Sequence, residues 1–224
     1  MVGSVEPSHP LIHHYYHVYA DGEWTWPVSE HMEACDRSGL LEAAGCVNVG
    51  LVGQPDARDR VRSWLVAQNV TFRVVSEQDT GWEQVTQARL HADSFTVDGC
   101  VLYAHTKGAA NPHVPVNHPW RRTMCYYNVT RWRESVAALR EGYDVSGVYW
   151  LRMPQAPEHA DHNWFFAGTY WWTTMGFLRG LQPPPVNHRW DAEGWIGYEK
   201  SAVMRVKDWN PTGMPGNFYE GPLW

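Results

Sequence analysis

The first half of the chain alternates short apolar segments with helical segments, and this alternation restricts the possible folds more than any other feature. Segments rich in β-branched and aromatic residues, which we expect to be strands, lie at 11–20, 46–53, 70–75 and 100–105. Apolar residues at helical spacing, or a proline in the first turn, predict helices at 27–41, 56–68 and 81–92. Helices between successive strands imply right-handed crossovers. The sequence therefore predicts an α/β fold with a mostly parallel sheet flanked by helices.

The second half is less regular, but it can be divided in the same way. We expect a polar loop at 107–119, a long helix at 120–141 and a strand at 145–151. An aromatic segment at 163–172, a helix at 173–181 and a further short helix within 189–201 follow. A chain of 224 residues buries one sizeable core, so a single domain over residues 1–224 is expected. Its core covers about residues 11–200, and residues 202–224 form an ordered C-terminal tail rich in Gly, Pro and aromatic residues.

Charge and aromatic content narrow the classes of ligand. The net charge is −6, and Lys and Arg form no stripe, which argues against extended nucleic acid as a partner. The chain has 14 Trp and 11 Tyr, many of them beside Gly, Pro, His and Asn in the second half. Aromatic rings stack on the C–H face of a sugar while polar neighbours bind its hydroxyls, so a carbohydrate ligand is one interpretation. The other is a core rich in aromatic residues.

Cysteine use and hydropathy indicate the compartment. The four cysteines, at positions 35, 46, 100 and 125, form no Cys-x-x-Cys pair. We expect reduced thiols, neither a disulfide framework nor a zinc site. The N-terminal residues 1–10 lack a basic-then-apolar signal, and the apolar runs are too short to span a membrane. These observations predict a cytoplasmic protein without a membrane span.

An α/β sheet binds its ligands at the carboxyl ends of its strands. Three parts of this chain therefore deserve most weight as site candidates. They are the end of the first strand at 19–23, the end of the strand at 105–108, and the aromatic loop within 163–172.

Six short motifs follow one another between residues 12 and 200. They are His17-x-Tyr19 with Trp24, Ser38-Gly39-Leu40, Tyr103-x-His105-Thr106-Lys107-Gly108, Trp120-Arg121-x-x-Met124, Ala167-Gly168-x-x-Trp171-Trp172 and Arg189-x-x-Ala192-Glu193-x-Trp195-Ile196. In this order they resemble a family of small bacterial and phage glycosyltransferase-domain proteins, distantly similar to the rhamnan-synthesis F proteins of polysaccharide clusters. The resemblance implies a GT-A-like, Rossmann-type sheet. It also implies transfer of a sugar from a nucleotide-sugar donor, UDP- or GDP-sugar in the first place, to a hydroxyl of a glycan, a protein or a modified nucleobase. Nucleic acid would enter only as such a modified base.

The first and fourth strands would then hold the nucleotide and its phosphates. Tyr19 is expected to stack on the base and Asp21 to accept a hydrogen bond from ribose or uracil, although both also suit a strand end and a turn. GT-A enzymes usually end the fourth strand with Asp-x-Asp, which holds a divalent metal, whereas this chain has His105, Thr106 and Lys107 there. Such cations neutralise phosphate directly. A metal is therefore in question, and the alternative for Lys107 is a solvated turn cation.

Further roles follow from the same resemblance. Arg121, at a helix start, is expected to face inward and bind phosphate, whereas Arg122 suits solvent. Residues expected to bind the sugar or the acceptor are His162, Asn163, Trp164, Gly168, Trp171 and Trp172. Trp171 and Trp172 point to opposite faces of a strand, so we expect one in the core and one in the cleft.

Glu193 is the candidate general base for the acceptor hydroxyl. It lies near the start of a late helix, where inverting GT-A enzymes place a carboxylate, and the adjacent Trp190 and Trp195 would raise its basicity by desolvation. Asp191 is the rival, although an acid at that place also suits a helix cap.

Two other classes of function compete with the transferase. One is a non-catalytic carbohydrate-binding protein. The other is a metal-dependent hydrolase built on the cluster His159-Ala160-Asp161-His162, whose side chains are of the metal-binding type but lack an obvious fourth ligand in the sequence.

Overall fold

A computed structural model describes residues 11–152, 164–186, 188–197, 204–210, 218–221 and 223. Seven strands form one sheet in the order β3-β2-β1-β4-β8-β5-β9. Their bounds are β1 Ile12–Tyr19, β2 Val47–Val52, β3 Phe72–Gln78, β4 Cys100–His105, β5 Val145–Gly147, β8 Trp171–Thr174 and β9 Val206–Asp208. A separate two-stranded ribbon pairs β6 (Trp150–Arg152) with β7 (Trp164–Phe166).

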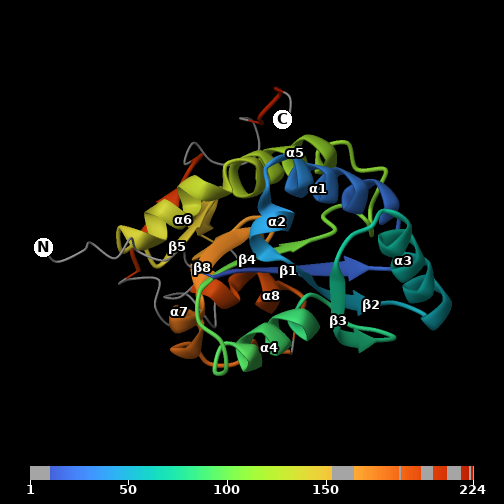
Figure 1. The fold of residues 1–224 in the computed structure, drawn as a ribbon, viewed down its shortest axis with the longest axis horizontal. Coiled ribbons are helices and arrows are strands. Elements are labelled where there is room, and N and C mark those ends of the chain that lie inside the picture. The colour runs from blue at the N-terminus through green and yellow to red at the C-terminus, as the bar shows by residue number, and fades with distance from the viewer. Residues whose placement is uncertain are drawn as a thin grey trace, which may run out of the picture.

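Helices cover both faces of the sheet, so the molecule has three layers (Figure 1). One side carries α1 Thr25–Arg37, α2 Leu40–Ala44, α3 Pro55–Ala67, α5 Asn117–Cys125 and α6 Trp132–Arg140. The other carries α4 Gln84–Asp93, α7 Met175–Arg179 and α8 Trp190–Gly194, followed by a 3-10 turn at Trp195–Gly197. Because side chains alternate along a strand, each face of the sheet has its own apolar cluster. Tyr16 belongs to the α1 side, and Tyr15 and Tyr103 belong to the α4 side.

The predicted α/β fold with a mostly parallel sheet is confirmed. β1, β2, β3 and β4 pair in parallel, and β9 is parallel to β5. β8 is the exception, since it runs antiparallel to both of its neighbours, β4 and β5. It returns from the β6–β7 ribbon and so enters the sheet in the opposite direction.

The helix predicted at 120–141 is wrong as a single element. It is interrupted between α5 and α6 by a π-helical turn at Tyr126–Thr130, in which the Arg131 N–H bonds to the Tyr126 carbonyl at 3.1 Å. The carbonyl of Asn128, inside this wider turn, accepts a hydrogen bond of 2.7 Å from the Trp172 indole. A helix thus bends to meet a buried donor on β8, which local sequence does not reveal.

Three other boundaries differ from the predictions. The helix predicted at 27–41 ends at Arg37, because Gly39 has a φ of +74° and starts the separate α2. The strand predicted at 145–151 divides into β5 and β6 next to Tyr149, whose φ is +63°. The helix predicted at 173–181 begins only at Met175, because the two threonines before it complete β8.

The described part of the C-terminal tail packs against α5 and the π-helical turn. The Tyr219 ring stacks on Tyr126 at 3.5 Å, and its N–H donates to Thr123 Oγ1 at 2.8 Å. Leu223 is buried, and its carbonyl accepts from the Thr130 hydroxyl.

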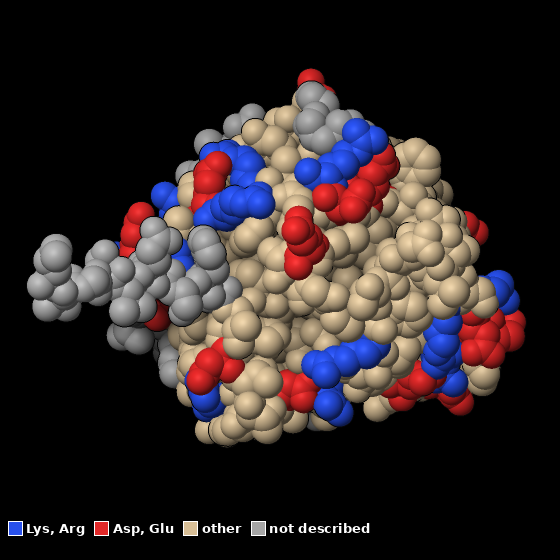
Figure 2. Space-filling model, viewed as in Figure 1, with Lys and Arg blue, Asp and Glu red and all other residues tan. Residues whose placement is uncertain are grey.

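Surface charges of both signs are interspersed on the face shown in Figure 2, where they form no continuous basic stripe. Exposed pairs such as Arg60–Asp56 and Arg37–Glu33 neutralise one another along single helices. Within the part of the chain that the structure describes, no helix is long and apolar enough to cross a membrane.

Gly22 brings two loops into contact at the carboxyl edge of the sheet. A Cβ added at Gly22 would lie 2.4 Å from the Ala109 carbonyl oxygen, which accepts the Glu23 N–H at 2.9 Å. We expect Gly22→Ala to lower the free energy of unfolding by about 1–3 kcal/mol, because a backbone atom cannot yield as a side chain can. Gly176→Ala is the matched control, since its nearest atom is 3.6 Å away and alanine favours a helix. Urea unfolding of both variants checks this, and equal stabilities would contradict it.

Candidate functional site

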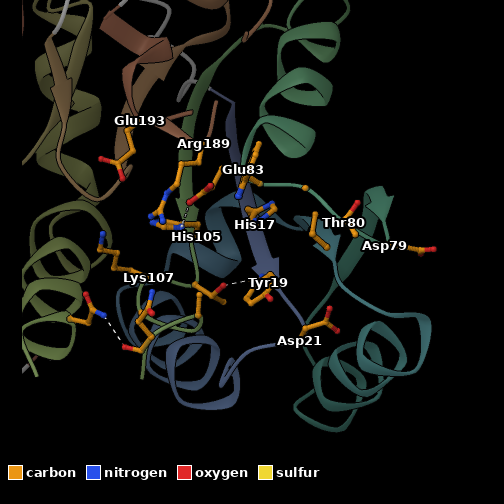
Figure 3. Close-up of a pocket in the computed structure, with 18 residues that line it drawn as sticks. His17, Tyr19, Asp21, Asp79, Thr80, Glu83, His105, Lys107, Arg189 and Glu193 are labelled. Carbon is orange, nitrogen blue, oxygen red and sulfur yellow. Dashed lines mark hydrogen bonds and ion pairs between the residues drawn. The ribbon is translucent and has the colours of Figure 1, made fainter. Parts of the chain in front are cut away.

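A pocket lies at the topological switch point of the sheet. The chain runs outward from β1 through β2 to β3 and then returns to β4 on the other side of β1. A pocket of about 620 Å³ opens at the carboxyl ends of these strands. Its walls come from the ends of β1 and β4, the loop before α4 and the start of α8 (Figure 3). A crevice of this kind is where open α/β sheets bind ligands.

The ends of β1 and β4 are fixed to each other by hydrogen bonds. Thr106 donates its N–H to the His17 carbonyl at 3.0 Å, and its hydroxyl accepts the Tyr19 N–H at 3.0 Å. Thr106 is thus buried, and its hydroxyl supports the strand ends. Tyr19 itself is half-buried and lines the pocket, as predicted for a residue that contacts the base.

One end of the pocket is acidic. Asp21, Asp79 and Thr80 lie together there, far from Lys107 and Glu193 in Figure 3. Asp21 Oδ1 accepts the Gln54 N–H at 2.8 Å, which fixes the carboxylate at the rim. Ionised carboxylates only accept hydrogen bonds, so this end suits hydroxyl or amino donors such as those of a nucleoside.

His105 and Glu83 form a buried ion pair in the middle of the pocket. Glu83 Oε1 lies 3.0 Å from His105 Nδ1, and the Gly168 carbonyl lies 2.8 Å from His105 Nε2. Both ring nitrogens of His105 are thus engaged by the protein, one by a carboxylate and the other by a backbone carbonyl. Burial alone would raise the pKa of Glu83, but the hydrogen bond and charge of His105, with His17, hold it well below its ordinary value.

This pair changes the predicted role of His105. It lines the pocket, but both of its ring nitrogens already have partners within the protein, Glu83 and the Gly168 carbonyl. It therefore offers a phosphate no free donor.

Lys107 follows this pair in the chain and lines the same pocket. Its ammonium lies 3.8 Å above the Trp120 ring, and its backbone carbonyl accepts a hydrogen bond from Arg121 at 3.2 Å. Burial lowers the pKa of Lys107 and nearby Arg189 adds to this, whereas Glu193 and Glu83 oppose it. An ammonium in such surroundings gains from an anionic ligand.

The prediction that Arg121 binds phosphate is wrong. Its side chain is directed inward, as expected, but it lies outside the pocket. It is buried and pairs with the equally buried Glu30, with Nε 3.0 Å from Oε1. Its observed role is to hold the Lys107 turn in place.

Glu193 enters the pocket from α8, on the side opposite Lys107 (Figure 3). Burial raises the pKa of Glu193 and the Glu83 charge adds to this, while Lys107, His105 and Arg189 act against it. A carboxylate with raised basicity next to a cationic site has the property expected of a general base. Arg189, one turn earlier, also lines the pocket.

Asp191 does not line the pocket. Its Oδ2 accepts the His188 N–H at 2.8 Å, a backbone group that lies just before α8. The catalytic role that the sequence allowed for Asp191 therefore gains no support from the pocket lining.

The aromatic segment contributes less to the pocket than predicted. Trp171 and Trp172 point to opposite faces of β8, as expected, but both are fully buried, so the prediction that one lines the cleft is wrong. The reason is that helices cover both faces of this inner strand. Gly168 supports His105 through its carbonyl, and Trp164 lies on the β6–β7 ribbon, stacked on Trp150 and outside the pocket lining. His162, Asn163 and the His159–His162 cluster lie outside the described residues.

The sequence analysis missed Glu83, Asp79 and the role of Arg189. Glu83 and Asp79 come from the loop between β3 and α4, which has no motif of its own. Their only available signal was position, because this loop follows the carboxyl end of β3. Arg189 belongs to one of the sequence motifs, but no role was predicted for it.

The end of β4 carries His105, Thr106 and Lys107 in place of the Asp-x-Asp carboxylates. Among the described residues, no group of three or more His, Cys, Asp and Glu side chains close enough to share an ion includes a residue of the pocket lining.

Neither a protein-family model nor a curated protein matches the sequence. Among solved structures, the chain is similar to 4-diphosphocytidyl-2C-methyl-D-erythritol synthase from Anaerococcus prevotii, with 8% identity, a TM-score of 0.46 and 89% of each chain covered. It is also similar to a mannosyltransferase from Pyrobaculum calidifontis in complex with GDP-Man and Mn²⁺, with 13% identity and a TM-score of 0.49. That match covers 93% of this chain and 58% of the mannosyltransferase. At these values neither likeness assigns a ligand or a reaction to this chain.

The neutral state of His17 makes the fold sensitive to acid. His17 lies 2.8 Å from the Thr86 hydroxyl, and burial lowers its pKa from 6.5 to about 4. Between pH 6.5 and about 4, His17 binds a proton in the unfolded chain but not in the folded chain. The free energy of unfolding therefore falls as the pH drops through this range. In His17→Gln, which keeps a polar group beside Thr86, we expect this fall to be smaller by on the order of 3 kcal/mol. Unfolding curves at a series of pH values check this, and parallel pH dependences in the two proteins would contradict it.

Proposed function

We propose that the protein is a glycosyltransferase that uses a nucleotide-sugar donor, UDP- or GDP-sugar in the first place, and a hydroxyl acceptor. The observation that carries this is the arrangement of one pocket at the switch point: a carboxylate of raised pKa, Glu193, faces the cations Lys107 and Arg189. Transfer of a sugar requires these two elements together, a base for the acceptor and positive charge for the diphosphate leaving group.

The different chemistry of the two ends of the pocket supports one orientation of the nucleotide-sugar donor. The acidic end with Tyr19, Asp21 and Asp79 would receive the base and ribose, which offer donors and a stacking face. The diphosphate would then reach Lys107 and Arg189, the Lys and Arg side chains among the described lining residues. This order places the sugar carbon near Glu193.

Leaving-group stabilisation would rest on fixed side chains. Lys107 is held from below by Trp120 and through its backbone by Arg121, so its ammonium needs little reorganisation when charge develops on the phosphate. The reaction is therefore proposed to proceed without a carboxylate-held metal, and to persist in a chelator.

Lys107→Ala should weaken the binding of a nucleoside diphosphate roughly 10-fold to 100-fold, the range expected for a lost charged hydrogen bond. Calorimetry with UDP, GDP, CDP and TDP tests this. Lys207→Ala is the matched control, because its ammonium also lies above an indole, 4.5 Å from Trp209, away from the pocket. Failure of all four nucleotides to bind the wild-type protein would sink the proposed function, and unchanged affinity in Lys107→Ala would remove Lys107 from the phosphate site.

Glu193→Gln should leave donor binding nearly intact and reduce turnover by roughly 10²–10⁴-fold, as expected for loss of a positioned base. Hydrolysis of the bound nucleotide sugar, with water as the acceptor, is the measurement. Because the base acts when ionised and its pKa is raised, wild-type turnover should fall with decreasing pH at values above the ordinary glutamate range. Asp191→Asn should retain turnover, since Asp191 binds the backbone before α8 and lies outside the pocket lining. Loss of activity in that variant and not in Glu193→Gln would make Asp191, and not Glu193, the general base.

The same measurements separate the competing functions. A non-catalytic carbohydrate-binding protein would bind sugars without needing the diphosphate and would show no turnover. A hydrolase built on His159 and His162 would lose its activity in a chelator and would keep it in Glu193→Gln.

A further inference from the structure

Three metal-ligating side chains meet in the core on the side of the sheet away from α4. His14 comes from β1, and His31 and Cys35 come from α1, four residues apart on one face of the helix. One nitrogen of each histidine and the Cys35 sulfur all lie within 4.8 Å of one another, and the two Nε2 atoms are 2.9 Å apart. All three side chains are completely buried, and none of them lines the pocket.

We propose that His14, His31 and Cys35 bind a single Zn²⁺ ion as a structural site that fastens α1 to β1. Imidazole nitrogen and thiolate sulfur are ligand types that zinc takes in proteins, and three of them leave one position of the tetrahedron open.

Hydrogen bonding alone leaves this cluster incomplete. Two neutral imidazoles that meet through their Nε2 atoms share one proton, and the remaining nitrogen of His14, Nδ1, is buried without a hydrogen-bond partner. A buried ring with an unpaired nitrogen is costly in an otherwise apolar core. A metal bound at both Nε2 atoms would replace the single hydrogen bond between the rings with two metal–nitrogen bonds.

The neighbouring groups fit a ligated state. The second nitrogen of His31, Nδ1, lies 3.8 Å from the Cys125 sulfur, so His31 can bind the metal through Nε2 while its other N–H is held in place. A bound dication removes the proton of a coordinating thiol outright, as the ligand role of Cys35 requires.

The protons balance as follows. On binding, the Cys35 thiol releases one proton to solvent, and the imidazole that carried its proton on Nε2 moves it to Nδ1. Both Nε2 lone pairs then face the ion. Because all three side chains are completely buried, the ion would be taken up as the chain folds. The sequence had indicated a free thiol at Cys35, and this proposal assigns it a ligand role instead.

Refolding in Co²⁺ is the decisive experiment, because a cobalt–thiolate bond gives a charge-transfer band that imidazole sites lack. The protein is produced without a polyhistidine tag and as the His159→Ala/His162→Ala double variant, which removes the other His-rich segment. We expect about one equivalent of Co²⁺ per chain and a thiolate band. Cys35→Ser should lose the band. Cys46→Ser, whose thiol lies outside the cluster beside the Val47 carbonyl, should keep it.

The Cys125→Ser variant tests whether Cys125 is a ligand of the metal or only a neighbour of the ligand His31. Because Cys125 contacts His31 and not the metal, Cys125→Ser should keep the band. The substitution should lower the metal affinity by roughly 10-fold to 100-fold. The protein purified from zinc-containing medium should also contain zinc, and should melt at a lower temperature after unfolding and refolding in a chelator. A wild-type protein that carries no metal and gives no band after refolding in Co²⁺ would overturn the proposal, and so would a band that survives in Cys35→Ser. The wild-type measurements decide even if that variant does not fold.

Discussion

β1 and β4 pair in parallel with His17 opposite His105, although two other strands, β2 and β3, come between them in the chain. The connections leave the pair in opposite directions, so no helix can cover the groove between their carboxyl ends. The pocket is a consequence of this pairing. Thr106 ties the two ends together, and Gly22 allows the loop after β1 to touch the loop after β4. The charged groups of the site are attached to this junction, either directly or through α4 and α8.

The parallel half of the fold could be predicted because each of its elements has a local signal. Apolar runs such as 46–53 and the helical spacing of Val61 and Leu65 are visible without knowledge of any partner. The direction of β8 could not be predicted, since strand direction depends on the path of the preceding chain. The π-helical turn was missed for a related reason: its cause is the Trp172 indole, which lies 44 residues away in sequence.

The candidate site was only partly predictable. Lys107 and Glu193 were found because each lies at a place that the fold favours, a strand end and the start of a late helix. Glu83 was not found, because its meaning comes entirely from His105, 22 residues further along, and no local pattern joins the two. Arg121 shows the converse error. Its position at a helix start suggested that Arg121 binds a phosphate, but the anionic group that it binds is the carboxylate of Glu30.

The π-helical turn at Tyr126–Thr130 sets the rotational phase between α5 and α6. A π-helical turn holds one more residue than an α-helical turn, and each residue of an α-helix accounts for about 100° of rotation. Met124 in α5 and Trp132 and Val136 in α6 therefore reach the same core although they do not share one regular helical face. A deletion of one residue within this turn would regularise the helix and swing the apolar face of α6 away from the sheet. Length is thus more constrained here than in the polar loop before α5, where the chain can lose a residue without turning a helix.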